Sequence, residues 1–356
     1  MRVGAFVLAA QFPGQGQREP LHRAIRTGEV AEQSGLDSVW LAEHHFVPYG
    51  VCPSAVTLAA LLLGRTRRIS VGTAVTVLPN AHPVALGEQA SLLHLTSGGR
   101  FALGVGRGGP WVDLEVFGGG LDAYEHGFPE ALDLLLRWLR EARVGTDGER
   151  YQFREVEVVP RCDEPVAPAE VAPGAAQLSR PPVVVACTSP GTVRLAAQRG
   201  LPMLLGMHCD NEEKAEAIAM WRREAREAGH GHEEIEHAAS LHVSAGVAQV
   251  GDNTQEAAES LTKTMPGWFR EGLGAHRTVD GRQRTMRDPH GYTELLCRLH
   301  PVGTPRLCAD RLAETQERTG IGRFALLVEG TGDLAATERN VQRLGEEVLP
   351  LLPPEH

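Results

Sequence analysis

Three histidines stand at positions where proton-transfer chemistry could take place. His44 and His45 follow the acidic residue Glu43 at the end of a short apolar run, and His82 comes after the next such run. A histidine has a pKa of about 6.5, so its imidazole can accept and release protons at neutral pH. A lone histidine is more often a hydrogen-bonded structural residue, but two together at a strand end favour acid–base catalysis. The spacing of these residues does not match a metal site, and we expect none.

A glycine-rich run, Gly104–Gly109, follows another apolar run and contains Gly106 and Arg107. It matches the pattern G-x-G-x-x-G, but a dinucleotide-binding motif would follow the first strand and open directly into a helix, which Pro110 prevents. Two interpretations remain open. The run is either a strand end where a flat ligand approaches the backbone and Arg107 binds a phosphate, or a tight turn with a solvated arginine.

A third candidate is the segment that contains Thr188, Ser189 and Thr192, between a predicted strand and a predicted helix. Free N–H groups at the start of a helix, together with nearby hydroxyl groups, can bind a phosphate. The alternative is an ordinary helix cap, in which Ser189 precedes Pro190. The phosphate interpretation requires Arg107 and this segment to lie close together.

These candidates all follow short apolar runs, which alternate along the chain with segments of helical periodicity. Eight such runs, each with a helical segment nearby, predict an α/β protein of the (β/α)8 TIM-barrel class, with its site at the carboxyl ends of the strands. A doubly wound sheet is the alternative. The predicted strands are residues 3–8, 38–41, 69–73, 101–105, 183–186, 203–205, 241–247 and 324–328.

We expect one domain over residues 1–356, with two additions to the barrel. Residues 149–182 are predicted to be an irregular insertion with a small hairpin, formed by 150–153 and 156–159 and followed by a proline-rich crossing. Residues 264–300 lack hydrophobic periodicity and contain several glycines. Because long segments without a pattern are usually functional or disordered, residues 264–300 are predicted to be a mobile lid over the barrel mouth.

The composition is that of an ordinary globular protein, since 42% of the 356 residues are hydrophobic and 22% are charged. Lys and Arg total 35 against 45 Asp and Glu, and the net charge of −10 argues against nucleic-acid or anionic-membrane binding. The six cysteines include no C-x-x-C pair, so free thiols in a reducing compartment are expected. No apolar stretch reaches the roughly 18 residues of a membrane span, and a cytoplasmic protein is expected.

Several stretches, in order along the chain, resemble the bacterial luciferase family of flavin-dependent monooxygenases, and most of all its α subunits. The longest are Asp37–Phe46 (DSVWLAEHHF), Gly72–Val84 (GTAVTVLPNAHPV) and Gly99–Gly108 (GRFALGVGRG). The likeness covers most of residues 1–208 and 301–349. The shorter matching stretches are Val116–Gly118, Ala196–Leu204 and Pro301–Pro305.

The resemblance implies a TIM barrel that takes reduced FMN (FMNH2) from a separate flavin reductase and lets it react with O2. In that family the product is a flavin C4a-hydroperoxide, which then oxygenates a small organic substrate. A homodimer is expected. Luciferase-like chains rich in Arg and poor in Lys often serve specialised metabolism, so a polyketide-like or terpenoid-like substrate is expected. The alternatives are a deazaflavin-dependent oxidoreductase and a non-catalytic flavin-binding or accessory subunit, of which His44 disfavours the second.

The resemblance also assigns roles to single residues near the predicted strand ends. His44 falls on the family's catalytic histidine, and His45 and His82 fall on its other active-site histidines. Ala74–Val75 falls where the family has a non-prolyl cis peptide bond under the isoalloxazine ring.

Arg107 matches a phosphate-binding arginine of the family, and Thr188–Thr192 matches its phosphate turn. The chain also departs from luciferase at three places. Gly106, which lies in the cofactor-binding run, stands where luciferase has a reactive cysteine, and Glu125 stands where it has a second phosphate-binding arginine. The segment that corresponds to luciferase's long mobile lid, residues 264–300, has a different sequence here.

Overall fold

Eight parallel strands close into a barrel in the computed structural model, which describes residues 1–162, 179–282 and 287–353. Each strand pairs with the next one along the chain, and the last pairs with the first, so the sheet has no free edge. This closure confirms the TIM barrel and excludes the doubly wound sheet. The strands are β1 (Arg2–Val7), β2 (Ser38–Leu41), β3 (Ser70–Thr73), β5 (Phe101–Gly106), β8 (Val183–Cys187), β9 (Met203–Leu205), β10 (Val243–Val247) and β13 (Arg323–Leu327).

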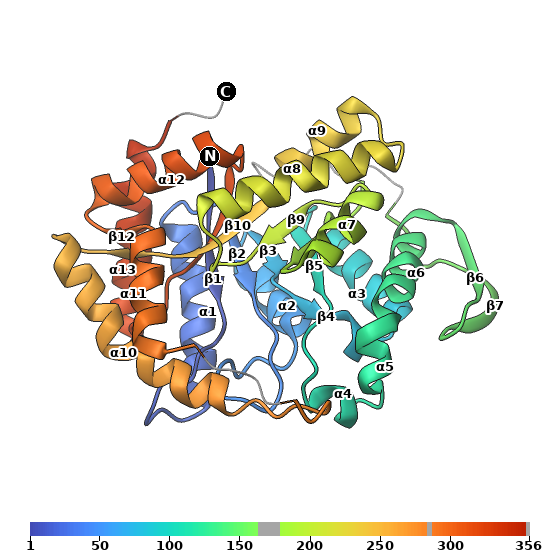
Figure 1. The fold of residues 1–356 in the computed structure, drawn as a ribbon, viewed down its shortest axis with the longest axis horizontal. Coiled ribbons are helices and arrows are strands. Elements are labelled where there is room, and N and C mark those ends of the chain that lie inside the picture. Colours follow the sequence, from blue (N-terminus) through green and yellow to red (C-terminus); the bar gives the residue numbers. More distant parts are fainter. Residues whose placement is uncertain (163–178, 283–286, 354–356) are drawn as a thin grey trace.

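All eight strands lie where the apolar runs predict them, and helices surround them on the outside (Figure 1). Several helices begin at a residue whose side-chain oxygen accepts from a backbone N–H of the first turn, as Ser54, Asp210 and Asn253 do. The surrounding helices are α1 (Arg18–Gln33), α2 (Ala55–Arg65), α3 (Pro83–Thr96), α6 (Phe128–Arg140), α7 (Pro190–Gln198), α8 (Asn211–Glu227), α10 (Thr254–Gly274), α11 (Pro289–Leu299), α12 (Pro305–Thr319) and α13 (Leu334–Arg343).

Side chains alternate along the strands and so build two apolar layers. In β1, Val3, Ala5 and Val7 pack with helix side chains in the outer layer, whereas Phe6 and the following Leu8 belong to the layer inside the barrel. The inner layer continues into the buried face of α10. This helix therefore covers one side of the barrel mouth.

A buried ion pair fixes the ends of the first and last strands. The Glu329 carboxylate accepts hydrogen bonds from the backbone N–H groups of Leu8 and Ala10, at 2.7 and 3.3 Å, and from Nε of Arg23 at 3.2 Å. Arg23 also donates to the carbonyl groups of Ala10 and Gly332. Each charged group is thus paired and hydrogen-bonded. The pair therefore holds the ends of β1 and β13 in a single arrangement at the mouth of the barrel.

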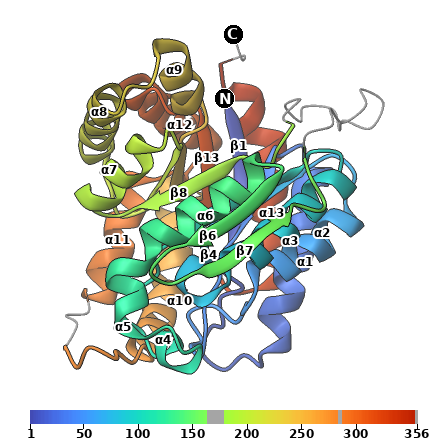
Figure 2. The ribbon, with the colours of Figure 1, turned by 90° about the vertical axis from the view of Figure 1, so that its right-hand side faces the viewer.

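The small hairpin exists, but the prediction misplaced it. It is formed by β6 (Arg143–Asp147) and β7 (Gln152–Glu157), which pair antiparallel outside the barrel, beside α6 (Figure 2). Only Val144 of β6 is buried, so this strand has no apolar alternation by which the sequence could show it. Residues 163–178 of the predicted insertion lie outside the described residues.

The segment 264–300 is more regular than its sequence suggests. Helix α10 continues to Gly274, and α11 follows after a short connection, so helices occupy both ends of the segment. The glycines and Pro266 conceal the helical pattern, because both residue types are poor helix formers. Met265, Trp268 and Phe269 are nevertheless buried at helical spacing, and tertiary packing outweighs the low propensity.

No helix among the described residues is long and apolar enough to cross a membrane.

Several short elements lie between the barrel strands or follow the last of them. The short elements are β4 (Thr76–Val77), α4 (Asp113–Val116), α5 (Gly120–Asp122), α9 (His232–Ser240), β11 (Gln249–Val250), β12 (Val302–Gly303), η1 (Leu78–Asn80), η2 (Ala123–Gly127), η3 (Leu344–Val348) and η4 (Leu349–Leu351).

Candidate active site

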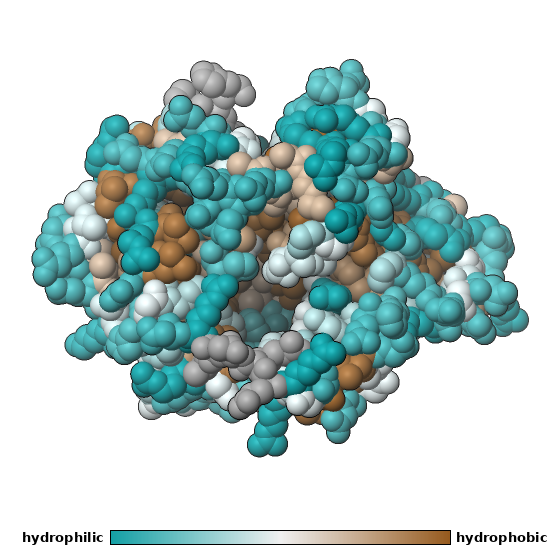
Figure 3. Space-filling view, viewed as in Figure 1, coloured by the Kyte–Doolittle hydropathy of each residue, from teal (hydrophilic) through white to brown (hydrophobic). Residues whose placement is uncertain are grey.

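A pocket of about 1000 Å3 opens at the carboxyl ends of the strands, which is where TIM-barrel enzymes hold their active sites. Its walls come from the segments after β2, β3 and β5, from the end of α10, and from the connection between α10 and α11. Figure 3 shows the molecule hollowed near the centre of this face. Four of the candidate residues line this pocket: His44, His45, Ala74 and Val75. The other candidates are not among its lining residues, namely His82, Gly106, Arg107, Thr188, Ser189 and Thr192.

The peptide bond between Ala74 and Val75 is cis, as the resemblance implies, and both residues line the pocket. Gly106 lies directly behind Val75, since a Cβ at this glycine would stand only 2.6 Å from a Val75 methyl group. Next to it, the Thr73 hydroxyl donates to the carbonyl of Gly104 at 2.7 Å and accepts from its N–H at 2.9 Å. These contacts hold β3 and β5 together and give the pocket a firm apolar floor.

His44 is packed tightly against the loop that follows β2. Its backbone N–H donates to the Cys52 carbonyl at 3.0 Å, and the Tyr49 ring meets its imidazole edge-on at 4.9 Å. A Cβ at Gly50 would lie 2.6 Å from the imidazole Nδ1, so only glycine leaves room for this ring. Nδ1 is buried and has no hydrogen-bond partner among the described residues.

Burial, together with the smaller effects of the neighbouring His276 and His45, lowers the pKa of His44 to about 3. This differs from the pKa of about 6.5 on which the sequence argument for a base relies. In the ligand-free chain the imidazole is therefore neutral at physiological pH. It can accept or donate a hydrogen bond, depending on which nitrogen carries the proton.

His45 and Glu43 also line the pocket, and the carboxylate holds three segments together. Glu43 accepts from the N–H of Ala55 at 3.2 Å and from that of Val77 at 3.0 Å. The same carboxylate lies 3.5 Å from Nε2 of His45, whose ring packs edge-on against Phe117. Glu43 thereby fixes the loop that presents both histidines.

His82 is placed differently from the other two histidines. It is the exposed residue that precedes α3, and its ring packs edge-on against Tyr151 at 5.2 Å. It is not among the residues that line the pocket. Its catalytic role remains a prediction drawn from the resemblance.

Arg107 leaves the end of β5, and its guanidinium lies 4.3 Å from the centre of the Tyr124 ring. Within the described ranges it forms no ion pair. The strands β5 and β8 pair with Val105 opposite Val185, so Arg107 and the segment after Cys187 emerge side by side at the mouth. The phosphate interpretation requires Arg107 and the segment of Thr188, Ser189 and Thr192 to lie close together, and the pairing of β5 with β8 agrees with this requirement.

The segment after β8 forms an ordinary helix cap. Thr192 Oγ1 accepts from the N–H groups of Thr188 and Ser189, both at 3.2 Å, and Ser189 Oγ accepts from the N–H of Thr192 at 3.4 Å. Several donors that a phosphate could use are therefore already occupied. The phosphate-binding role of Thr188, Ser189, Thr192 and Arg107 remains a prediction.

The structure adds an aromatic wall that the sequence analysis missed. Tyr49 stacks on Trp268 at 4.8 Å, with the rings 5° from parallel, and Phe269 of α10 packs against Tyr292 of α11 at 5.1 Å. Tyr49 stands five residues after His44, so the loop after the second strand could have indicated it. Nothing local in the sequence indicates that α10 and α11 deliver the other rings to the same pocket.

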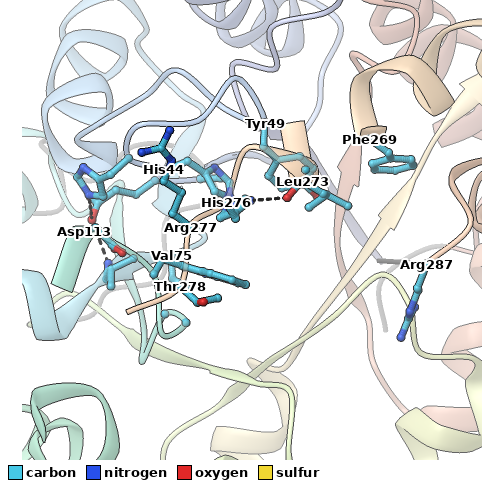
Figure 4. Close-up of a pocket in the computed structure, with 18 of the residues that line it drawn as sticks. His44, Tyr49, Val75, Asp113, Phe269, Leu273, His276, Arg277, Thr278 and Arg287 are labelled. Carbon is cyan, nitrogen blue, oxygen red and sulfur yellow. Dashed lines mark hydrogen bonds and ion pairs between the residues drawn. The ribbon is translucent and has the colours of Figure 1, made fainter. Parts of the chain in front are cut away.

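A two-strand contact closes another side of the pocket. Trp111 and Thr278 form an antiparallel bridge, in which the N–H of Val112 donates to the Arg277 carbonyl and the N–H of Val279 to the Pro110 carbonyl. The side chains of Trp111 and His276 lie against each other at 4.7 Å (Figure 4 labels His276). The connection between α10 and α11 is thus fastened to the segment after β5.

These residues fit a flavin. The pocket has a firm apolar floor at Ala74–Val75 and aromatic walls, and it is lined by His44, whose buried Nδ1 has no hydrogen-bond partner among the described residues. An unpaired arginine stands beside a helix start at the same strand ends, as a phosphate requires. Among the described residues, no group of three or more His, Cys, Asp or Glu side chains is placed to hold a metal ion.

A closed barrel with such a pocket at its carboxyl end is the architecture of a large class of TIM-barrel enzymes. The chain belongs to the luciferase-like monooxygenase family, whose model matches residues 1–322. It is therefore an enzyme of a flavin-dependent monooxygenase family, and the resemblance seen in the sequence is confirmed.

Similar chains include the alkanal monooxygenase alpha chains of Photorhabdus luminescens, 30% identical over 99% of this chain and 98% of the relative, and of the Kryptophanaron alfredi symbiont, 29% identical with the same coverage. Among solved structures, monooxygenase RslO1 from Streptomyces bottropensis has a TM-score of 0.79 at 22% identity, over 98% of this chain and 99% of that one. An F420-dependent secondary alcohol dehydrogenase has a TM-score of 0.70 at 16% identity, over 99% of both chains. The structural likenesses support the barrel fold.

Proposed function

We propose that this protein is the oxygenating component of a two-component system that uses FMNH2 and O2 to oxygenate a small organic substrate. The observation that carries the proposal is the apolar pocket floor, where Ala74 and Val75 line the mouth of the barrel together with His44. Reduced FMN, delivered by a separate flavin reductase, would supply two electrons. One oxygen atom of O2 would then enter the product, and the other would be reduced to water. A role in specialised metabolism, in a cytoplasmic homodimer, completes the proposal.

The chain's own residues divide the work. Ala74, Val75 and the backbone at Gly106 support the flat ring system from below, while Arg107 and the turn at Ser189 hold the phosphate. His44 presents a neutral imidazole to the pocket, where it can hold or accept a proton near the reacting atoms. The connection between α10 and α11 excludes water, which would otherwise consume the reactive oxygen species unproductively.

Anaerobic titration of the purified protein with reduced FMN, FAD and a reduced deazaflavin tests this proposal. We expect reduced FMN to bind at least tenfold more tightly than the other two, because the sequence offers one candidate phosphate turn with Arg107 and no second nucleotide-binding motif. On admission of O2, bound reduced FMN should be reoxidised with less hydrogen peroxide once substrate is added. Preferred binding of the deazaflavin would favour hydride transfer, and flavin binding without any effect on oxidation would favour an accessory subunit.

A further inference from the structure

Three arginines on the connection between α10 and α11 line the pocket: Arg277, Arg282 and Arg287. All three are exposed, and within the described ranges their guanidinium groups form no ion pair and no side-chain hydrogen bond. The chain as a whole carries a net charge of −10. The connection, which also carries Asp280, thus presents several positive charges to the pocket although the whole chain is acidic.

The carboxylates inside the pocket do not neutralise these charges. Glu43 is held by the N–H groups of Ala55 and Val77, and Asp113 accepts from the Asn80 side-chain amide at 2.7 Å. Both acids face the segments after β2 and β5. In Figure 4 Asp113 and Arg287 lie on opposite sides of the pocket, and Arg277 lies on the same side as Asp113. The arginine that stands apart from these acids is therefore Arg287.

The acidic residues on the Arg287 side are committed to helix caps. Asp288 accepts from the N–H of Gly291 at 2.7 Å and caps α11. Asp210 accepts from two N–H groups at the start of α8, and Glu213 accepts in return from the N–H of Asp210. The nearest carboxylates are thus occupied with backbone donors, and the guanidinium of Arg287 keeps its own donors for another partner.

The arginines stand beside an apolar surface. The guanidinium of Arg287 lies 5.2 Å from the centre of the Tyr292 ring, and this ring packs on Phe269. Leu273 and Tyr49 extend the same lining toward His44. A ligand that bridges these groups needs an apolar or aromatic body and an anionic end.

We propose that the substrate is an organic carboxylate, whose apolar body lies against Phe269 and Tyr292 and whose carboxylate is bound by Arg287. A guanidinium binds a carboxylate through two parallel, charge-assisted hydrogen bonds, which fixes the orientation of the substrate as well as its affinity. This inference rests on the proposed function, because it assigns the substrate to the same pocket. It assigns Arg287 to the substrate and leaves the flavin phosphate to Arg107.

The test compares two probes of equal shape, 2-naphthoate and its neutral amide 2-naphthamide, by calorimetric titration of the purified protein. We expect the carboxylate to bind at least about tenfold more tightly than the amide. Arg287→Gln should remove most of that preference, whereas Arg277→Gln, on the Asp113 side of the pocket, should keep it. Arg306→Gln, on the exposed face of α12, is the matched control and should leave it unchanged.

Two results would overturn the inference. The first is no preference for the carboxylate in the parent protein, whether both probes bind or neither does, and the second is a preference that survives in Arg287→Gln. Loss of the preference in Arg107→Ala instead would place the anion at the strand ends and would also overturn it. The ratio of FMN to riboflavin affinity separates this failure from failure of the proposed function. That ratio should fall in Arg107→Ala and stay within about twofold in Arg287→Gln.

Discussion

His44 combines a buried imidazole with a nitrogen that has no partner, and this combination carries the first prediction. We expect His44→Ala to fold and to bind reduced FMN within a few-fold of the parent, but to lose at least about a hundredfold in oxygenation of whichever substrate the parent accepts. Added imidazole should restore part of the rate. Oxygenation within threefold of the parent would contradict the assignment and would move attention to His45.

The lowered pKa of His44 has a consequence for the pH profile. With a pKa of about 3, the imidazole stays neutral from pH 5 to pH 8, so its protonation state does not change there. The pH profiles of the oxygenation rate are compared between the parent and His44→Ala. The parent should show no inflection near pH 6.5 that is missing in the variant. Such an inflection would mean that bound ligands raise the pKa of this histidine far above its value in the free chain.

Arg107 is predicted to contribute most of the affinity for the flavin phosphate. Its guanidinium has no carboxylate partner in the described part of the chain. It lies over the Tyr124 ring, 4.3 Å from the ring centre. A charge-assisted hydrogen bond contributes about 1.5–3 kcal/mol, so Arg107→Ala should weaken FMN binding roughly ten- to a hundredfold. Riboflavin, which lacks the phosphate, is the control ligand and should bind both proteins alike. Unchanged FMN titrations would remove Arg107 from the site.

At the scale of elements, the connection between α10 and α11 is the part of residues 264–300 that faces the pocket, and we propose that it acts as the lid. Its backbone is fastened to the segment after β5 by two hydrogen bonds, one of them from the N–H of Val279 to the Pro110 carbonyl at 3.0 Å. Val279→Pro removes that donor, because proline has no N–H. Val279→Ala keeps it and is the matched control.

We expect Val279→Pro to leave the fold and flavin binding intact and to increase the hydrogen peroxide released for each FMNH2 oxidised. The physical reason is that a loosened connection admits water to the pocket. Limited proteolysis should cut the connection faster in this variant than in Val279→Ala. If coupling of O2 consumption to product is equal in the two variants, the connection does not protect the reaction.

At the scale of the whole molecule, two buried histidines make stability depend on pH. Burial lowers the pKa of His242 and of His300 to about 3. His242 Nδ1 accepts from the Met203 N–H at 2.9 Å, and His300 Nε2 lies 2.6 Å from the Met207 carbonyl. Both rings fix the ends of β9, and both are neutral in the folded protein at pH 7.

The unfolded chain, in which these histidines have a pKa of about 6.5, binds more protons than the folded chain between pH 6.5 and pH 3. Stability therefore falls as the pH drops through this range, by about 2 kcal/mol for each group between pH 7 and pH 5. Urea unfolding of the parent and of His300→Gln at both pH values measures the effect. The variant should lose less stability than the parent on acidification, and an equal loss in both proteins would contradict the assignment.

The sequence by itself determines the barrel and the places where its site residues emerge. Buried strands of a barrel read as short apolar runs, and all eight were recognisable because each is bounded by a helical segment. Parallel strands all end at one mouth, so residues such as His44, Val75 and Arg107 could be assigned to that mouth without knowing any contact between them. The cis peptide bond at Ala74–Val75 followed from the family resemblance alone.

Only the tertiary structure decides which side chains meet across the mouth. Trp111 and Thr278 pair although more than 160 residues separate them, and the buried face of α10 is hidden in the sequence by Pro266 and several glycines. The pKa of His44 is likewise a property of its surroundings, since burial beneath Tyr49 and beside His276 sets it. Local periodicity indicates whether a residue is buried, but closure of the barrel selects its neighbours. The connection that carries Arg277 and Arg287 borders the pocket only through that closure.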